Sequence, residues 1–322
     1  MKKITVLGGG TGTYVVLSGL KNYPVDLAVI VSMMDSGGST GKLRDQLGVL
    51  PPGDLRQCLV ALSEAPLLWR KLFLYRFEKG DLEGHNFGNV FLSALEKVTS
   101  NYQEVMETAS FVLKTKGQVI PVTFDHTHLT ALYENGQVLK GESKIDENNY
   151  ENGRIIKVSL EPQAQVNQKA ITRILESNFL ITGPGDLYTS IIPIFLFKEI
   201  KEAFAKTKAK LIYVMNLMTK KGQTANFRAS DHIKEIEKYS GKKIDIVIIN
   251  NGIVPEHILK WYLTHGEKQV ESDLYNKETK KKIIEEDLVD RTEIVKNKSD
   301  KIFRSILRHD SQKLGQVINK II

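Results

Sequence analysis

The sequence has a single cysteine and no long apolar segment, and each absence excludes a class of protein. Cys58 has no second cysteine to pair with, so an internal disulfide framework is excluded and a reducing compartment is expected. The first apolar run reaches glycine after four residues, which is too short for a signal peptide. No apolar run approaches the roughly 18 residues that a membrane span needs. We therefore expect a cytoplasmic protein without a membrane span.

The sequence also lacks a concentrated excess of charge. Its net charge is +7 and its pI is near 9.1, with 41% hydrophobic and 26% charged residues, which is an ordinary globular composition. Basic residues near the C-terminus alternate with acidic ones, as where Lys282 is followed by Glu285 and Glu286. Such alternation is typical of a solvated face, and no basic motif is interleaved with aromatic residues. We expect no nucleic-acid partner.

Short apolar runs that end in glycine or small polar residues recur along the chain. Residues 4–7 and 25–31 are rich in β-branched residues and flank a helical pattern at 13–20, a unit that implies parallel strands. Similar runs lie at 179–182, 211–214 and 244–249. The sequence predicts an α/β fold, Rossmann-like and doubly wound, with a mainly parallel sheet. Ligands of such sheets bind at the carboxyl ends of the strands.

The middle of the chain follows a different pattern. Residues 73–110 predict two helices, and residues 118–139 predict short strands with Asn135-Gly136 as a hairpin turn. Together with residues 155–160 they predict a small antiparallel β region. The polar segment 141–153 is expected to be a mobile loop.

These patterns predict a single domain built around one sheet. We expect its core at residues 1–66 and 167–265, an insertion at about 67–166 and a C-terminal extension at about 266–322. Within that extension, residues 288–295 are expected to complete the sheet edge and residues 310–321 to form a helix. The alternative is that the tail mediates a homo-oligomer.

A glycine-rich turn joins the first expected strand to the first expected helix. It consists of Gly8, Gly9, Gly10, Thr11 and Gly12, followed by Thr13. Glycines let the backbone approach a phosphate, and a helix N-terminus offers free N–H groups and the positive end of its dipole. The dinucleotide fingerprint has glycine where this chain has Thr13, so that match is imperfect. The turn predicts a phosphate site for a nucleotide.

Two acidic residues follow in loops that face the same edge of the expected sheet. Asp35 begins a hydroxyl-rich loop after the second strand, with Ser36 and Gly37 next to it. Asp54 has two interpretations. It fits an N-cap of a helix beginning near Leu55, or it joins Asp35 in holding Mg²⁺ beside phosphate oxygens.

The motifs, taken in order, resemble one superfamily from residue 1 to about residue 265. They are GGGTG, DSGGSTGKLR, PPGDLRQCLVAL, HNFGN, ITGPGDLYTSIIP and NLMTKKGQT. The superfamily contains the CofD-like 2-phospho-L-lactate transferases of deazaflavin synthesis and the gluconeogenesis factors (YvcK-like proteins). The segment from Asn216 to Thr219 and the compact length favour the second branch. Members of that branch bind UDP-sugars, have no established catalysis, and support growth and cell shape on gluconeogenic carbon sources.

The resemblance implies a UDP-sugar ligand, such as UDP-N-acetylglucosamine, no required cofactor and no catalytic residue. It implies that the glycine turn, the Asp35 loop and three further segments bind that ligand. Their expected contact residues are Gly8, Gly9, Gly10, Thr11, Gly12, Thr13, Asp35, Ser36, Gly37, Asn86, Asn89, Gly183, Pro184, Gly185, Asp186, Tyr188, Thr189, Asn216 and Thr219. The chain departs from the family pattern after Thr219, where Lys220-Lys221-Gly222-Gln223-Thr224 replaces Gln-Pro-Gly-Glu-Thr.

Other reactive residues have plainer explanations. His126 and His128 are spaced to point the same way on a strand, which permits metal binding, but no further ligand cluster lies near them in the sequence. Cys58 falls within an apolar helical pattern and is expected in the core. No Ser-His-Asp arrangement is recognisable. Two enzymatic alternatives remain: a Mg²⁺-dependent phospholactyl-type transferase with a nucleotide diphosphate donor, and an NAD-dependent redox enzyme.

Overall fold

The protein is built around one seven-stranded parallel sheet. The computed structural model describes residues 1–148, 152–274, 281–292 and 305–322. The strands are β1 (Lys3–Gly8), β2 (Asp26–Val31), β3 (Gln118–Pro121), β7 (Phe179–Thr182), β8 (Lys210–Val214), β9 (Ile246–Asn250) and β10 (Lys282–Glu286). Their spatial order is β10-β9-β8-β7-β1-β2-β3, and every neighbouring pair is parallel. The central strands are buried almost throughout, as their unbroken apolar runs predict for parallel strands.

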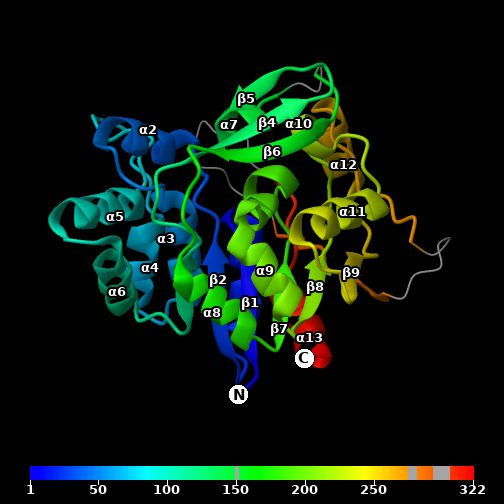
Figure 1. The fold of residues 1–322 in the computed structure, drawn as a ribbon, viewed down its shortest axis with the longest axis horizontal. Helices are drawn as coiled ribbons and strands as arrows, with labels where there is room; N and C mark the ends of the chain where they lie inside the picture. Colours follow the sequence, from blue (N-terminus) through cyan, green and yellow to red (C-terminus); the bar gives the residue numbers. More distant parts are fainter. Residues whose placement is uncertain (149–151, 275–280, 293–304) are drawn as a thin grey trace.

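Helices cover both faces of the sheet, as expected for a doubly wound fold. They are α1 (Gly10–Leu20), α2 (Gly38–Leu47), α3 (Pro52–Leu62), α4 (Leu67–Leu74), α5 (Phe87–Val98), α6 (Tyr102–Leu113), α8 (Gln168–Glu176), α9 (Lys198–Lys206), α11 (Ala229–Ser240), α12 (Glu256–Thr264) and α13 (Ser311–Ile321). Helix α1 packs between α3 and α13, whereas α9 packs against α8 and α11. Figure 1 shows α8 and α9 in front of the strands. Among the described residues, no helix is long and apolar enough to cross a membrane.

A small antiparallel sheet covers one end of the main sheet. It consists of β4 (His128–Tyr133), β5 (Val138–Lys140) and β6 (Ile155–Glu161) in the order β5-β4-β6. In Figure 1 it lies beyond the carboxyl ends of the main strands, away from both chain termini. The short helices α7 (Glu142–Asp146) and α10 (Lys221–Thr224) lie at the same end. The predicted hairpin turn at Asn135-Gly136 is confirmed between β4 and β5.

The C-terminal segment belongs to the core of the fold. A Cβ atom added to Gly315 of α13 would lie 2.3 Å from the Gly19 carbonyl oxygen of α1, so the two helix backbones are in direct contact there. The predicted C-terminal helix is therefore confirmed. The predicted edge strand at 288–295 is wrong, because β10 (Lys282–Glu286) forms that edge; residues 293–295 lie outside the described residues.

The two helices expected within residues 73–110 are confirmed as α5 and α6. Two further expectations need correction. Strand β3 lies inside the expected insertion, yet it pairs with β2 in the main sheet. The segment 141–153, expected to be a loop, contains helix α7, whose Ile145 is completely buried.

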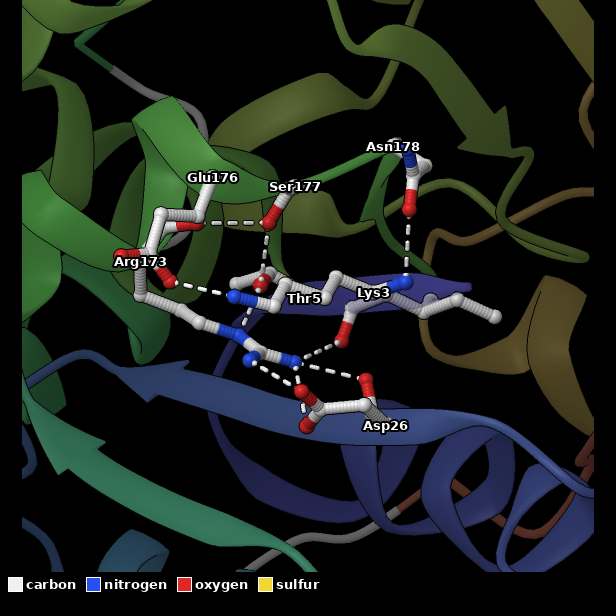
Figure 2. A network of polar contacts seen from close by, with 8 residues as sticks. Lys3, Thr5, Asp26, Arg173, Glu176, Ser177 and Asn178 are labelled. Carbon is white, nitrogen blue, oxygen red and sulfur yellow. Dashed lines mark hydrogen bonds and ion pairs between the residues drawn. The ribbon is translucent and has the colours of Figure 1, made fainter. Parts of the chain in front are cut away.

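A buried arginine holds the amino ends of β1 and β2 together (Figure 2). The side chain of Arg173, on α8, is only 5% exposed. Its guanidinium donates to Asp26 Oδ1 and Oδ2, both at 3.0 Å, and to the Asp26 carbonyl oxygen at 2.6 Å. Its Nε donates to Thr5 Oγ1 at 3.1 Å. The bond from Arg173 holds the carboxyl pKa of Asp26 below its usual value. This network lies at the end of the sheet opposite the small sheet, so its role is structural.

We expect Arg173→Met to lower the free energy of unfolding by about 3 kcal/mol, because Asp26 loses its partly buried partner. Lys3→Met is the control, because Lys3 pairs with Glu176 through exposed side chains, and it should cost less than about 1 kcal/mol. Denaturant unfolding of both variants measures the difference. Equal losses in the two variants would contradict the role assigned to Arg173.

Candidate functional site

The chain reverses its direction across the sheet between β1 and β7. From β1 it builds outward through β2 and β3, and it then returns to β7 and builds the other way through β8, β9 and β10. In parallel α/β sheets, ligands bind outside the carboxyl ends of the strands at such a switch point. The glycine turn after β1 and the turn Gly183-Pro184-Gly185 after β7 lie on either side of it.

The two turns are in backbone contact, which only glycine permits. A Cβ atom on Gly12 would lie 2.0 Å from the Pro184 carbonyl oxygen. Gly10 has a φ of +68°, a conformation that most side chains avoid. Thr13 is buried, and its hydroxyl donates to the Gly9 carbonyl oxygen at 3.1 Å. Thr13 therefore fixes the turn from within.

Helix α1 begins at Gly10 rather than at residue 13 as predicted. Its N-cap is Gly9, which has no side chain that could accept a hydrogen bond from the first turn. The first turn of a helix carries N–H groups without intrahelical partners, together with the positive end of the helix dipole. The glycine turn thus places a helix N-terminus at the switch point of the sheet.

The structure places Asp54 beside this turn, and Asp35 beside Gly53, the residue before Asp54. Asp35 follows β2, and its Oδ1 accepts a hydrogen bond from Gly37 N at 3.0 Å. A Cβ atom on Gly53 would lie 2.2 Å from Asp35 Oδ2, and one on Gly9 would lie 2.1 Å from Asp54 Oδ2. The N-cap prediction for Asp54 is wrong, because α3 begins at Pro52 and Asp54 lies in its first turn.

The turn after β7 is held by Asn216. The Asn216 side chain accepts from Gly185 N at 3.1 Å and donates to the Gly185 carbonyl oxygen at 2.8 Å, so its amide is engaged on both sides. Thr219 is buried, and its hydroxyl accepts from Lys268 N at 3.0 Å. These two residues of the expected site position loops in this structure.

Asn86 and Asn89 lie beneath the start of α2. Asn86 is the N-cap of α5, accepting from Asn89 N at 3.3 Å. The Asn89 side chain accepts from Arg56 Nε at 2.8 Å and donates to Ser39 Oγ at 3.3 Å. Both asparagines are at most 3% exposed. Their hydrogen bonds to Ser39 hold the first turn of α2, which follows the Asp35 loop.

Helix α7 brings two carboxyl groups to the site that sequence reasoning missed. Ser36 N donates to Glu142 Oε2 at 3.2 Å, and Thr189 Oγ1 donates to Asp146 Oδ1 at 3.0 Å. Gln223 Nε2 donates to the same Asp146 oxygen. Helix α7 therefore joins the Asp35 loop to the residues that follow β7. Its polar sequence gave no signal, because its partners are distant in the chain.

Loss of hydration and nearby carboxylates raise the pKa values of both groups on α7. For Asp146, burial contributes most and Asp186 adds to it, which raises its pKa to about 7. Burial, Asp146 and Asp35 raise the pKa of Glu142 well above its usual value. Burial alone would lower the pKa of Lys220, but Asp186 and Asp146 outweigh it and raise that pKa. The site thus contains several carboxyl groups and one lysine that lies close to them.

Other expected and unexpected features lie away from the glycine turn. Tyr188 is buried, and its backbone N–H donates to Gln223 Oε1 at 2.9 Å. Cys58 is buried in the core, which raises its thiol pKa. Within the described ranges, no group of three or more His, Cys, Asp or Glu side chains is arranged to hold a metal ion, so His126 and His128 lack further ligands. Two pockets of about 690 and 720 Å³ are lined by Phe111 and Met218, respectively, and neither is lined by residues of the glycine turn.

Comparison with known proteins identifies the family. A family model described as 2-phospho-L-lactate transferase CofD matches residues 4–289. The chain belongs to the CofD family. A protein of Bacillus subtilis named "Gluconeogenesis factor" is 39% identical over 319 residues, which cover 98% of this chain and 96% of the relative. A protein of Aquifex aeolicus named "Putative gluconeogenesis factor" is 40% identical over 330 residues, which cover 100% of this chain and 98% of the relative.

The solved structures agree with this assignment. The crystal structure of a Bacillus halodurans protein, described as a member of the UPF0052 family, superposes with a TM-score of 0.88. It is 33% identical and covers 99% of each chain. This protein therefore has the same Rossmann-like α/β fold as that solved structure.

We expect the raised pKa of Asp146 to make the protein less stable as the pH rises. A group whose pKa is higher in the folded state stabilises the fold below its unfolded-state pKa, near 4, and loses that contribution as the pH rises through about 7. Asp146→Asn keeps the acceptor oxygen but cannot ionise. Between pH 5 and pH 8, its free energy of unfolding should rise relative to the wild type by on the order of 2 kcal/mol.

Thermal or denaturant unfolding at the two pH values measures this difference. Glu147→Gln is the control, because Glu147 is exposed at the end of the same helix and its change should leave the pH profile as it is in the wild type. Parallel pH profiles of Asp146→Asn and the wild type would contradict the assignment.

Proposed function

We propose that this protein binds a UDP-sugar at the switch point between β1 and β7 and acts as a regulatory factor of carbon metabolism. The observation that carries the proposal is the N-terminus of α1, which lies at that switch point behind a turn of glycines. Gly9, the N-cap, has no side chain of its own to cap the helix, and Gly10 begins α1 at the same edge. A diphosphate supplies the negative charge and acceptor oxygens that such a helix end favours.

The remaining expected residues support the proposal by their positions. The Asp35 loop and the turn from Gly183 to Asp186 flank the glycine turn, so a nucleotide and its sugar would extend to either side of the diphosphate. Asn86, Asn89, Asn216, Thr189 and Thr219 would act by holding these loops, since their side chains are hydrogen-bonded within the protein. Helix α7 would cover the ligand, because it joins both loops.

The relatives support the regulatory part of the proposal. Their name places them in gluconeogenesis, and the resemblance of the motifs extends this to growth and cell shape on gluconeogenic carbon sources. Occupancy of the site would report the supply of nucleotide sugar to protein partners in the cytoplasm. No catalytic residue is assigned in this reading.

A Mg²⁺-dependent transferase is the second candidate, and the description of the matching family model favours it. The two carboxylates Asp35 and Asp54 fit a magnesium ion chemically, because Mg²⁺ prefers carboxylate oxygens beside phosphate. When bound, the ion would neutralise charge on a nucleotide diphosphate. Asp35 and Asp54 would hold the ion near the glycine turn.

The test uses a matched pair of glycine substitutions. Gly10→Asn adds a side chain at the site, and Gly241→Asn adds the same side chain at a φ of +70° with open space around it, at the end of α11. Asparagine tolerates positive φ, so both variants should fold. Gly10→Asn should weaken binding of UDP-N-acetylglucosamine at least tenfold in calorimetric titration, because it fills the space before α1.

Gly241→Asn should bind like the wild type. UDP-glucose, GDP and NAD complete the series, each with and without Mg²⁺. Binding of GDP alone, and only with Mg²⁺, would favour the transferase. Unchanged UDP-sugar affinity in Gly10→Asn would contradict the proposed site.

A further inference from the structure

Helix α2 carries an arginine that is buried without a full set of partners. Arg44 lies two turns beyond the Asp35 loop and is only 7% exposed. One terminal nitrogen, Nη2, donates to the carbonyl oxygen of Thr127, in the segment that leads into β4. Arg44 therefore joins α2 to the small sheet that covers the carboxyl ends of the main strands.

The other terminal nitrogen of Arg44 has no partner. Nη1 is shielded from solvent and makes no hydrogen bond with any residue that the structure describes. Within the same described ranges, no carboxylate lies within ion-pair distance of the Arg44 guanidinium. A guanidinium has five N–H donors, and burying its charge without an anion costs several kcal/mol. Arg173 shows the contrast, because it is equally buried but bonded to Asp26.

The surroundings of Arg44 contain both signs of charge, none close enough to pair with it. Burial lowers the pKa of Arg44, while Asp45 and Asp35 raise it from a distance. Burial and the charge of Arg44 lower the pKa values of His126 and His128. Lys97 and Lys140 act on these histidines in the same direction, and Asp125, Asp45 and Glu161 act against it. The imidazoles beside Arg44 provide no counter-charge, because a histidine side chain is either neutral or positively charged.

We propose that Arg44 binds a carboxylate or phosphate group in a second anionic subsite between α2 and the Thr127 segment. The proposal rests on the proposed function, since the subsite adjoins the loop of Asp35. Arg44 lies seven residues after Gly37, the N-cap of α2, which corresponds to roughly 10 Å along the helix. At that distance the anion lies on the α2 side of a bound diphosphate. It belongs either to an acidic sugar of the nucleotide or to a separate small anion.

The alternative is that Arg44 only latches the small sheet through Thr127. Arg44→Gln separates the two roles, because glutamine keeps an N–H donor for the Thr127 carbonyl oxygen but carries no charge. Lys140→Gln is the matched control, since it removes a half-exposed positive charge from the same sheet, where Lys140 pairs with Glu161. Arg44→Lys keeps the charge and loses the planar pair of donors.

The experiment is calorimetric titration of the full chain with UDP-glucose, UDP-glucuronate and inorganic phosphate. UDP-glucose reports the proposed function, and the difference between the two nucleotides reports the subsite. We expect wild type to bind UDP-glucuronate at least tenfold more tightly than UDP-glucose, or to bind phosphate alongside UDP-glucose. Arg44→Gln should abolish the preference for UDP-glucuronate or the binding of phosphate, and its affinity for UDP-glucose should change by less than threefold. Lys140→Gln should behave like the wild type in all three titrations.

The three titrations distinguish the possible sources of the anion. Loss of the acidic-sugar preference assigns the anion to the sugar, and loss of phosphate binding assigns it to a separate anion. A wild type that shows neither effect, or an Arg44→Gln variant that keeps both, overturns the subsite. Failure of UDP-glucose to bind the wild type contradicts the proposed function instead, and phosphate binding then tests Arg44 alone. If Arg44→Gln does not fold, Arg44→Lys should lower the same preference about tenfold, and an unchanged preference overturns the proposal.

Discussion

Close packing against glycines at the carboxyl edge of the sheet is the constraint on which the site depends. Gly12 lies against the Pro184 carbonyl group, Gly9 against the Asp54 carboxylate and Gly53 against the Asp35 carboxylate. A side chain at Gly12 would push apart the turns that follow β1 and β7, and one at Gly9 or Gly53 would displace the carboxylate of Asp54 or Asp35. The glycines thus let two halves of the sheet, built in opposite directions from β1 and β7, present their turns side by side. A helix N-terminus, two acidic residues and a second turn come together for this reason.

Two polar networks secure this arrangement from opposite ends. At the amino ends of the strands, Arg173 ties β1 to β2 through Asp26 and Thr5. At the carboxyl ends, α7 ties the Asp35 loop to Thr189 through Glu142 and Asp146. The first network pairs a buried charge, whereas the second contains carboxyl groups with raised pKa values. The contribution of α7 to stability therefore changes with protonation near neutral pH.

Much of the fold could be predicted from the sequence because its signals are local. Apolar runs such as 4–7 and 179–182, each followed by glycine, indicate parallel strands that end at a ligand edge. Short elements gave weaker signals: β3 (Gln118–Pro121) was assigned to the insertion because four residues carry little pattern. Helix α7 was expected to be a loop because its sequence is polar. Its carboxyl groups bind Ser36 and Thr189, which are distant in sequence, so the local pattern could not reveal these contacts. The burial of Arg44 was missed for the same reason, since it depends on the Thr127 segment.

The most direct test of the account is amide hydrogen exchange with and without UDP-N-acetylglucosamine. If the phosphates bind at the switch point, exchange should slow at residues 9–13 and at Gly183, Gly185 and Asp186, whose amides lie at the carboxyl ends of β1 and β7. It should stay unchanged around the hollow lined by Met218, Asn250 and Leu259, near the end of β9. Protection confined to that hollow, with the glycine turn exchanging as in the free protein, would contradict the account.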